Sequence, residues 1–261
     1  MSSILNYINF SLYILTFLLI WSFLAYKKNT TLKILIWIFW LLAIIMHAYM
    51  LNPIFQEKFN INLSLYYALL TVAFIISLFL YFSSIFSNTK FLGLVVLPII
   101  SLIFLFDFKD NPVSVRFNNF LFIHVILSLI SYSILCLSAA QSLILKVQEK
   151  KLKLNKPIGL ISSLPSLDAM DKLLFRMLAL GVLFLSLSLL SGFIFLEDIF
   201  SQHLAHKTIL SILAWIIFIF LIYTKKKYGW RGGKAANITL ICFFILFLSY
   251  FGTKTVLEII L

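Results

Sequence analysis

Apolar residues occur along this chain in runs long enough to cross a lipid bilayer, separated by short polar and basic stretches. About 20 consecutive apolar residues in a helix cross a hydrocarbon core that is roughly 30 Å thick. The runs predict an all-α integral membrane protein, a bundle of eight transmembrane helices over residues 4–26, 34–51, 63–86, 91–106, 117–145, 172–196, 207–224 and 235–256. No connection is long enough for a soluble domain, so we expect a single transmembrane domain over residues 1–261.

Basic residues are distributed unevenly over the connections between these helices. Sixteen of the 21 Lys and Arg residues fall in or beside alternate connections, mainly around residues 146–176 and 225–234, and the other five fall on the opposite side. Cytoplasmic connections of membrane proteins carry an excess of Lys and Arg. We therefore predict that the richer set is cytoplasmic and that both termini lie outside. The expected location is a bacterial cytoplasmic (inner) membrane, which the chain crosses several times.

The composition agrees with a membrane protein. The chain is 62% hydrophobic and 11% charged, with a mean hydropathy of +1.08, whereas a soluble domain is about 25% charged. The net charge of +12 is explained by basic connections facing anionic lipid, so nucleic acid is not an expected partner. Cys136 and Cys242 lie inside apolar runs without a CxxC pair, and no disulfide or thiol-redox centre is expected. We recognise no catalytic motif and do not expect an enzyme.

The four histidines are the main candidates for a functional site. On the predicted topology all of them lie toward the outer side of the membrane. His47 is near the end of the second helix and His124 is about two turns into the fifth, while His203 and His206 lie before and at the start of the seventh. A histidine inside an apolar helix is costly unless it has a partner, and it marks a functional site by default.

Neutral imidazole is a common axial ligand of haem iron. We predict that two of the three residues His124, His47 and His206 ligate haem iron, and that Lys207 at the rim meets a haem propionate. The alternative for each histidine is a hydrogen bond to a neighbouring helix, and His203 is expected in solvent. A small non-haem transporter or an accessory membrane subunit stays open as another function. A proton-coupled transporter would carry acidic residues at midplane, whereas those of this chain lie at helix ends or in connections.

Several short motifs resemble the cytochrome c assembly protein family, whose branches include CcsA, CcmC and the shorter HemX/YpjD-like proteins. The resemblance is strongest over residues 117–261 and favours the HemX/YpjD-like branch. The motifs that carry it occur in consistent order and are His124-Val125, Ser131-Tyr132, Ser166-Leu167-Asp168, Arg176, Leu180-Gly181, Ser191-Gly192, Lys207-Thr208, Ala214-Trp215, Gly229-Trp230-Arg231-Gly232 and Tyr250-Phe251-Gly252.

This resemblance implies a membrane protein that binds or handles haem, with other cytochrome assembly or membrane haem proteins as partners beside the lipid bilayer. His124 matches a haem-ligand position of the family, and His47 and His206 match histidines of the shorter branch. Residues 197–208 lack the tryptophan-rich segment that presents haem in CcsA and CcmC, and Tyr223 stands where CcsA has a membrane-embedded histidine. We therefore expect the chain to hold or relay haem near the outer leaflet without forming thioether bonds itself.

Overall fold

The structure, a computed structural model, describes residues 2–26, 29–52, 60–62, 65–106, 114–116, 119–154, 159–195 and 202–252. These residues form eight α-helices, three short 3-10 or π segments and two strands of three residues each. In chain order the elements are α1 (Ser2–Ala25), α2 (Thr30–Met50), β1 (Asn60–Asn62), α3 (Leu65–Phe86), η2 (Lys90–Leu92), α4 (Gly93–Ile103), β2 (Ser114–Arg116), α5 (Asn119–Lys153), η3 (Gly159–Ser163), α6 (Leu167–Phe195), α7 (Gln202–Tyr228), α8 (Gly233–Phe247) and η4 (Leu248–Gly252).

The predicted all-α fold of eight helices is confirmed. Seven of the helices are long and apolar enough to cross a membrane. The fourth is shorter: η2 and α4 together cover Lys90–Ile103, whereas the apolar pattern predicts a helix up to residue 106. Pro98 lies inside α4, where it removes one backbone hydrogen bond of the helix, and the chain continues in turns after Ile103.

Two helices extend beyond their apolar runs into the segment that the sequence predicts to be a basic loop. α5 continues to Lys153 instead of ending at residue 145, and α6 begins at Leu167 instead of residue 172. Lys, Glu, Gln and Leu have high helix propensities, and Lys153 pairs with Glu149 one turn earlier at 2.7 Å, which supports the helix. Apolarity therefore marks the membrane-embedded part of a helix rather than its ends.

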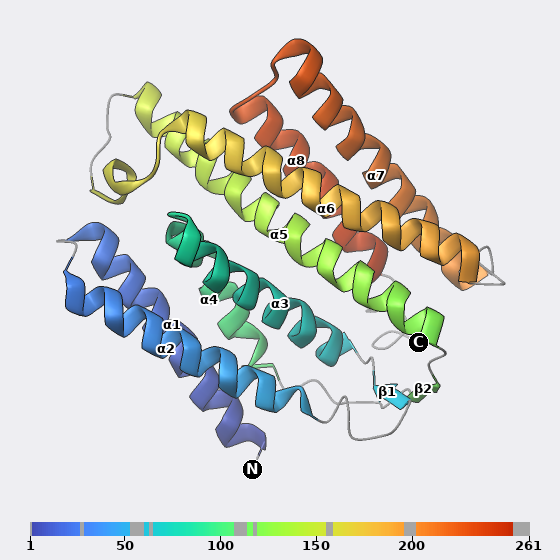
Figure 1. Cartoon of the computed structure of the whole chain (residues 1–261), viewed down its shortest axis with the longest axis horizontal. Coiled ribbons are helices and arrows are strands. Elements are labelled where there is room, and N and C mark those ends of the chain that lie inside the picture. The colour runs from blue at the N-terminus through green and yellow to red at the C-terminus, as the bar shows by residue number, and fades with distance from the viewer. Residues whose placement is uncertain are drawn as a thin grey trace.

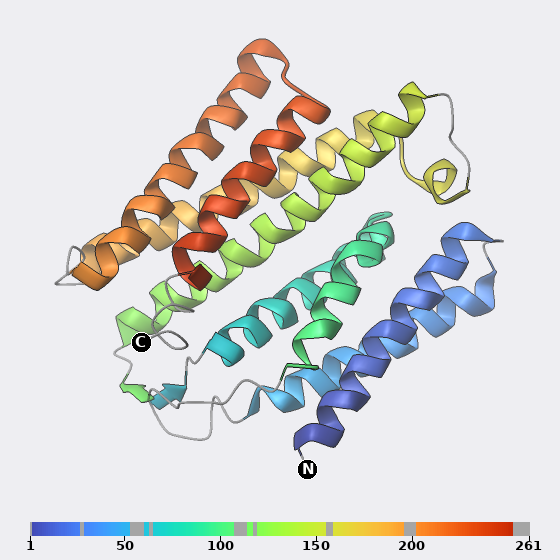
Figure 2. The same ribbon diagram turned by 180° about the vertical axis from the view of Figure 1, so that it is seen from behind.

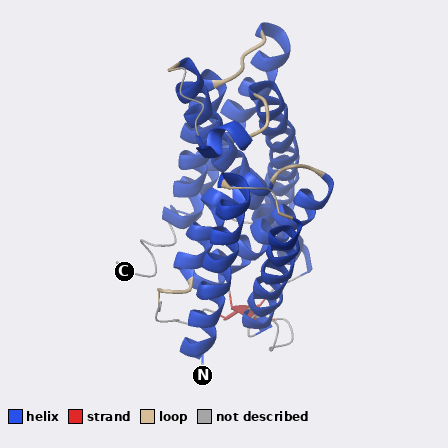
Figure 3. Ribbon diagram, turned by 90° about the vertical axis from the view of Figure 1, so that its left-hand side faces the viewer, coloured by secondary structure: helices blue, strands red, loops and turns tan. Residues whose placement is uncertain are grey.

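The helices form two neighbouring groups. α1, α2, α3 and α4 pack together in one group, and α5, α6, α7 and α8 form the other (Figures 1 and 2). α5 joins the groups because it also packs against α3 and α4. Viewed from the side, the helices share one general direction (Figure 3). Each group contains one of the histidines predicted to lie inside the membrane, His47 on α2 and His124 on α5.

A short antiparallel strand pair joins two connections at one end of the bundle. β1, which follows α2, pairs with β2, which precedes α5, so that Ile61 lies opposite Val115. The pair lies at the same end as the N-terminal end of α1 (Figure 1). The sequence analysis did not predict it, because three residues are too few for an alternating apolar pattern to be recognised.

Small side chains allow α5 and α6 to pack closely. The Ser131 hydroxyl on α5 donates to the carbonyl oxygen of Gly181 on α6 at 3.0 Å. A Cβ atom at Gly181 would lie 2.6 Å from Leu135 Cδ2, which no real side chain tolerates without movement. Gly and Ser at helix contacts permit this approach in membranes. It brings His124 on α5 within hydrogen-bond distance of α6.

Candidate functional site

His124 is hydrogen-bonded to α6 through one nitrogen of its ring. Its Nδ1 lies 2.9 Å from the carbonyl oxygen of Ser188 and 3.0 Å from the hydroxyl oxygen of Ser191. The Ser191 hydroxyl donates to the same Ser188 carbonyl at 2.7 Å. Because a carbonyl only accepts, the neutral His124 ring carries its proton on Nδ1. The lone pair on Nε2, which makes no hydrogen bond within the described residues, is then available to a metal.

A cavity of about 80 Å³ adjoins His124 between α5, α6, α7 and η4. One wall is polar: the Tyr132 hydroxyl lies 3.2 Å from Ser249 Oγ, which lies 2.9 Å from Ser211 Oγ. The lining residues are His124, Ser128, Tyr132, Leu185, Ser188, Leu189, Gly192, Phe193, Lys207, Thr208, Ser211 and Tyr250. The cavity thus combines an imidazole, hydroxyl groups, apolar side chains and one ammonium group inside an otherwise apolar bundle.

Lys207 is the basic residue of this cavity. Its Nζ lies 4.5 Å from the centre of the Tyr250 ring, a distance at which a cation is attracted to the ring face. His203 and His206 belong to the first two turns of α7, immediately before Lys207, but their side chains lie outside the described residues. The structure therefore brings His124 and Lys207 to one cavity and places the backbone of His206 next to it in the chain.

His47 lies in the other helix group, in a different environment. It is completely buried, and its Nδ1 is 2.9 Å from the hydroxyl of Tyr13 on α1. The rings of Phe74 and Phe104 meet its edge at centroid distances of 5.5 Å and 5.0 Å. Its Nε2 has no hydrogen-bond partner among the described residues.

The structure does not bring His47 and His124 into one site. His47 contacts side chains from α1, α3 and the turn after α4, whereas His124 bonds to α6 and lines the cavity among α5, α6, α7 and η4. Among the described residues, no group of three His, Cys, Asp or Glu side chains could hold a metal ion. Similar depth in the membrane, which the sequence indicated, does not place two histidines side by side when they belong to different helix groups.

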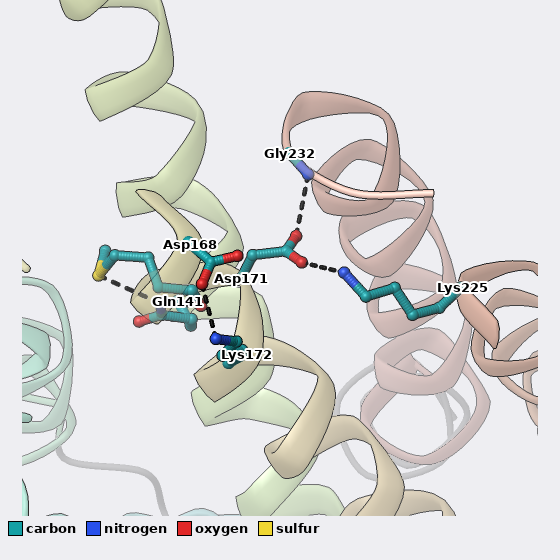
Figure 4. Close-up of polar contacts among 7 residues, drawn as sticks. Gln141, Asp168, Asp171, Lys172, Lys225 and Gly232 are labelled. Atoms are coloured by element: carbon teal, nitrogen blue, oxygen red, sulfur yellow. Dashed lines mark hydrogen bonds and ion pairs between the residues drawn. The ribbon is translucent and has the colours of Figure 1, made fainter. Parts of the chain in front are cut away.

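A second polar cluster lies at the opposite, basic end of the same helix group. Asp171 on α6 is only 4% exposed, and it accepts hydrogen bonds from the Lys225 ammonium on α7 and, at 2.9 Å, from the backbone N–H of Gly232 (Figure 4). Glu149 on α5 accepts the backbone N–H of Gly233 at 2.6 Å. We call these residues, Asp171, Lys225, Glu149, Gly232 and Gly233, the carboxylate clamp.

The carboxylate clamp explains the Gly-rich turn before α8. The first backbone N–H groups of a helix have no partner inside it and attract negative charge, and here two carboxylates supply that partner. Gly232 has φ +64°, a conformation that favours glycine. A Cβ at Gly233 would lie 2.9 Å from Glu149 Oε2. Sequence analysis missed this cluster, although two adjacent glycines at a helix start were a signal that something approaches the backbone closely.

The residues around His124 fit a haem group in chemistry and only partly in size. An imidazole with Nδ1 bonded to a carbonyl is the usual form of a histidine that ligates a metal through Nε2. Leu185, Leu189 and Phe193 offer apolar contact to a macrocycle, and Lys207 offers a cation to a carboxylate. The cavity, at about 80 Å³, is smaller than the roughly 300–1,000 Å³ of pockets that enclose a whole ligand. A haem ligated by His124 would therefore lie only partly inside the cavity, and the rest of it would contact the outer surface of the group α5–α8.

Fold and site together define a helical membrane protein that crosses the bilayer several times and has a histidine-lined cavity in its second helix group. The chain belongs to the cytochrome c assembly protein family, because the family model described as "Cytochrome C assembly protein" matches residues 41–261. This match includes His47 as well as His124 and begins before the range over which the sequence motifs resemble the family.

Three relatives show how far the similarity extends. Over 138 residues, 53% of this chain and 52% of the relative, the chain is 33% identical to "Inner membrane protein YpjD" of Escherichia coli (strain K12). It is 27% identical over 143 residues, 54% of this chain and 39% of the relative, to "Cytochrome c biogenesis protein CcsA" of Chlamydomonas reinhardtii. It is 29% identical over 144 residues, 54% of this chain and 53% of the relative, to "Protein HemX" of Brevibacillus brevis.

The chain spans about half the length of the first curated relatives that it matches. No solved structure matches it. The predicted family is thus confirmed from sequence similarity.

Proposed function

We propose that this protein binds haem as cargo at the cavity beside His124 and holds or relays it during cytochrome assembly. The observation that carries the proposal is the state of the His124 ring, whose Nδ1 is held by the Ser188 carbonyl while Nε2 makes no hydrogen bond within the described residues. Family membership supports it, since a relative is named as a cytochrome c biogenesis protein. Haem supplies the iron that Nε2 would ligate, and the protein supplies the orientation of the ring.

His206 is the better partner for His124 as the second axial ligand. It directly precedes Lys207 in the chain, and Lys207 lines the same cavity. His47 is the weaker candidate, because it lies in the other helix group, away from the cavity beside His124 and among the rings of Phe74 and Phe104. In this arrangement Lys207 pairs with a haem propionate.

We further infer that the cavity faces the outer leaflet of a bacterial inner membrane and that both termini lie outside. His124 is near the N-terminal end of α5, and the basic residues of α5 gather in its last turn at Lys150, Lys151 and Lys153. An excess of positive charge marks the cytoplasmic end of a membrane helix. The relative named as an inner membrane protein supports the same location. Haem would then be passed to other assembly proteins or membrane haem proteins on the outer side.

An absorption spectrum tests the haem site. The protein is purified in detergent from haem-sufficient cells, and its oxidised and dithionite-reduced spectra are compared with those of His124→Ala and His206→Ala. We expect a Soret band in the wild type that is largely lost in His124→Ala, because an axial ligand is removed. His203→Ala is the matched control, since it changes a histidine three positions before His206 in the same helix, and it should leave the band unchanged.

Two further measurements make the result decisive. Adding imidazole to His124→Gly should restore the band, because the free ligand replaces the missing ring, whereas an unfolded variant would not recover. A colourless wild type that also fails to bind added hemin would refute the proposal. The function would then be that of a non-haem transporter or an accessory subunit built on the same bundle.

A further inference from the structure

A second cavity of about 260 Å³ lies at the basic end of the molecule, between the two helix groups. One side is the polar connection from α3 to η2, formed by Ser87, Asn88 and Thr89, and the other is the first part of α6, which contributes Lys172 and Arg176. Neither the haem proposal nor the carboxylate clamp uses this cavity. Its lining has two cationic side chains and three polar ones, so it favours an anion.

The two basic residues differ in how much of their charge is already neutralised. Lys172 forms an ion pair with Asp168 at 2.7 Å, and both side chains are largely exposed. Arg176 lies one helical turn further along α6 and makes no hydrogen bond or ion pair with the described residues. Its guanidinium group can bind two oxygen atoms of a phosphate at once. Arg176 is therefore the principal candidate for binding an anion, with Lys172 as a second donor.

The height of the cavity along α6 indicates where the anion comes from. Arg176 is the last charged residue before 20 uncharged residues, Met177 to Leu196, so it stands where α6 enters the hydrocarbon region. On the other side, the cavity borders the end of α3 and the start of η2. Lys90, the first residue of η2, is not part of the lining, because its ammonium lies over the Trp37 ring, 4.7 Å from the ring centre. Phosphate groups of lipids occupy this boundary between apolar core and water.

The cavity also has an apolar wall, as a lipid site requires. Pro165, Met170 and Leu173 line it together with Phe91. A soluble phosphate ion makes no favourable contact with apolar side chains, whereas the glycerol and first acyl carbons of a phospholipid would pack against them. Basic pockets between membrane helices on the cytoplasmic side bind anionic lipid headgroups.

We propose that the cavity between the α3–η2 connection and α6 binds the phosphate of an anionic phospholipid, with Arg176 as the main ligand and Lys172 as the second. The lipid headgroup joins the two helix groups at their basic end. The site is independent of the His124 cavity, which lies toward the other end of α5 and α6.

Native mass spectrometry of the full-length protein in detergent tests this site. The protein is equilibrated with an equimolar mixture of phosphatidylglycerol and phosphatidylcholine, and the lipids that stay bound are counted. We expect the wild type to retain phosphatidylglycerol preferentially, and Arg176→Gln to reduce this preference about fivefold, as for the loss of one basic contact to an anionic lipid. Asp168→Asn, which releases Lys172, should instead increase it.

Matched variants and a soluble competitor give outcomes that decide the question. Lys150→Gln removes an exposed cation that does not line the cavity, and it should leave the preference unchanged. Arg176→Lys keeps the charge without the two-pronged geometry and should retain an intermediate preference, which also shows that the position tolerates substitution. Equal losses in Arg176→Gln and Lys150→Gln would overturn the proposal, as would displacement of the lipid by millimolar inorganic phosphate. The haem spectrum does not enter this test, so the two proposals fail independently.

Discussion

The hydrogen bonds to His124 Nδ1 determine which of its nitrogens can act. Two oxygens from α6 approach the same nitrogen, the Ser188 carbonyl and the Ser191 hydroxyl. A carbonyl oxygen can only accept a hydrogen bond, whereas a hydroxyl can donate or accept. The Ser188 carbonyl alone is therefore sufficient to keep the proton on Nδ1. The backbone therefore carries the more important contact, and no side-chain substitution removes it directly.

This gives a prediction for Ser191→Ala. The haem affinity of this variant should fall by less than about tenfold, because the Ser188 carbonyl stays in place. Removing a group that hydrogen-bonds a metal ligand commonly lowers affinity 10- to 100-fold. Titration of the apoprotein with hemin measures the change. The control is Ser186→Ala on the same helix, whose hydroxyl accepts from Trp215 Nε1 at 2.8 Å away from His124. A loss as large as that of His124→Ala would show that the hydroxyl, and not the carbonyl, orients the ring.

Individual residues of the candidate site were partly predictable from the sequence. His124 and Lys207 could be named because a histidine in an apolar helix and a lysine at a helix start stand out chemically, and both line the cavity. The pairing of histidines could not be decided, because it depends on how each helix is rotated about its axis, and packing sets that rotation. The hydrogen bonds of Ser188 to His124 and of Tyr13 to His47 could not be predicted for the same reason.

At the scale of elements, the contact between α5 and α6 depends on the lack of a side chain at Gly181. Gly181→Ala should destabilise the protein by roughly 1–3 kcal/mol, the usual range for overpacking, because its Cβ would meet Leu135 at 2.6 Å. Thermal unfolding in detergent measures the effect. Ala179→Ser, at an exposed position of the same helix, should change the unfolding midpoint little. An equal midpoint for the two variants would mean that Leu135 moves aside without cost.

The carboxylate clamp makes a contrasting prediction for two aspartates of α6. Asp171→Ala removes a buried acceptor from both Lys225 and the Gly232 N–H, and it should lower the free energy of unfolding by roughly 1–3 kcal/mol. Asp168→Ala removes only an exposed ion pair with Lys172, and such pairs contribute little. Thermal unfolding of the two variants side by side tests this. If both variants lowered the unfolding midpoint by a similarly small amount, water would have replaced the Asp171 carboxylate at the start of α8.

The ends of the elements were harder to predict than their existence. Apolar runs located all eight helices, yet α5 and α6 extend into residues that are polar and still favour helix. The start of α8 is determined by Glu149 and Asp171, which are far away in the sequence. A local pattern cannot show such long-range partners.

At the scale of the whole molecule, the orientation in the membrane can be tested by cysteine labelling. After replacement of Cys136 and Cys242 by Ala, single cysteines are introduced at Asn60 in β1 and at Asn88 in the connection after α3. In intact cells an impermeant thiol reagent should label Asn60→Cys and should label Asn88→Cys only after lysis, because the end carrying Asn88 is the basic one. The reverse pattern would place the His124 cavity on the cytoplasmic side.

The division into two helix groups was not predicted. Eight apolar runs specify a bundle, but they do not specify that α5 would pack against α3 and α4 as well as against the helices of its own group. That division separates His47 from His124, and it also creates the basic cavity between the α3–η2 connection and α6.

The length of α5 has a consequence for how the protein responds to salt. Its 35 residues extend about 52 Å at 1.5 Å per residue, well beyond a hydrocarbon core of roughly 30 Å. The turns around Glu149 therefore reach water, whereas His124 and its neutral hydrogen bonds stay within apolar surroundings. At 1 M salt the Debye length is about 3 Å, so exposed charges farther apart than this are largely screened from one another, whereas buried pairs are screened much less. Concentrated electrolyte should thus weaken the Lys153–Glu149 pair and loosen the last turn of α5, where trypsin would cleave near Lys150 and Lys153 more readily, while the N-terminal end of α5 around His124 remains insensitive to salt.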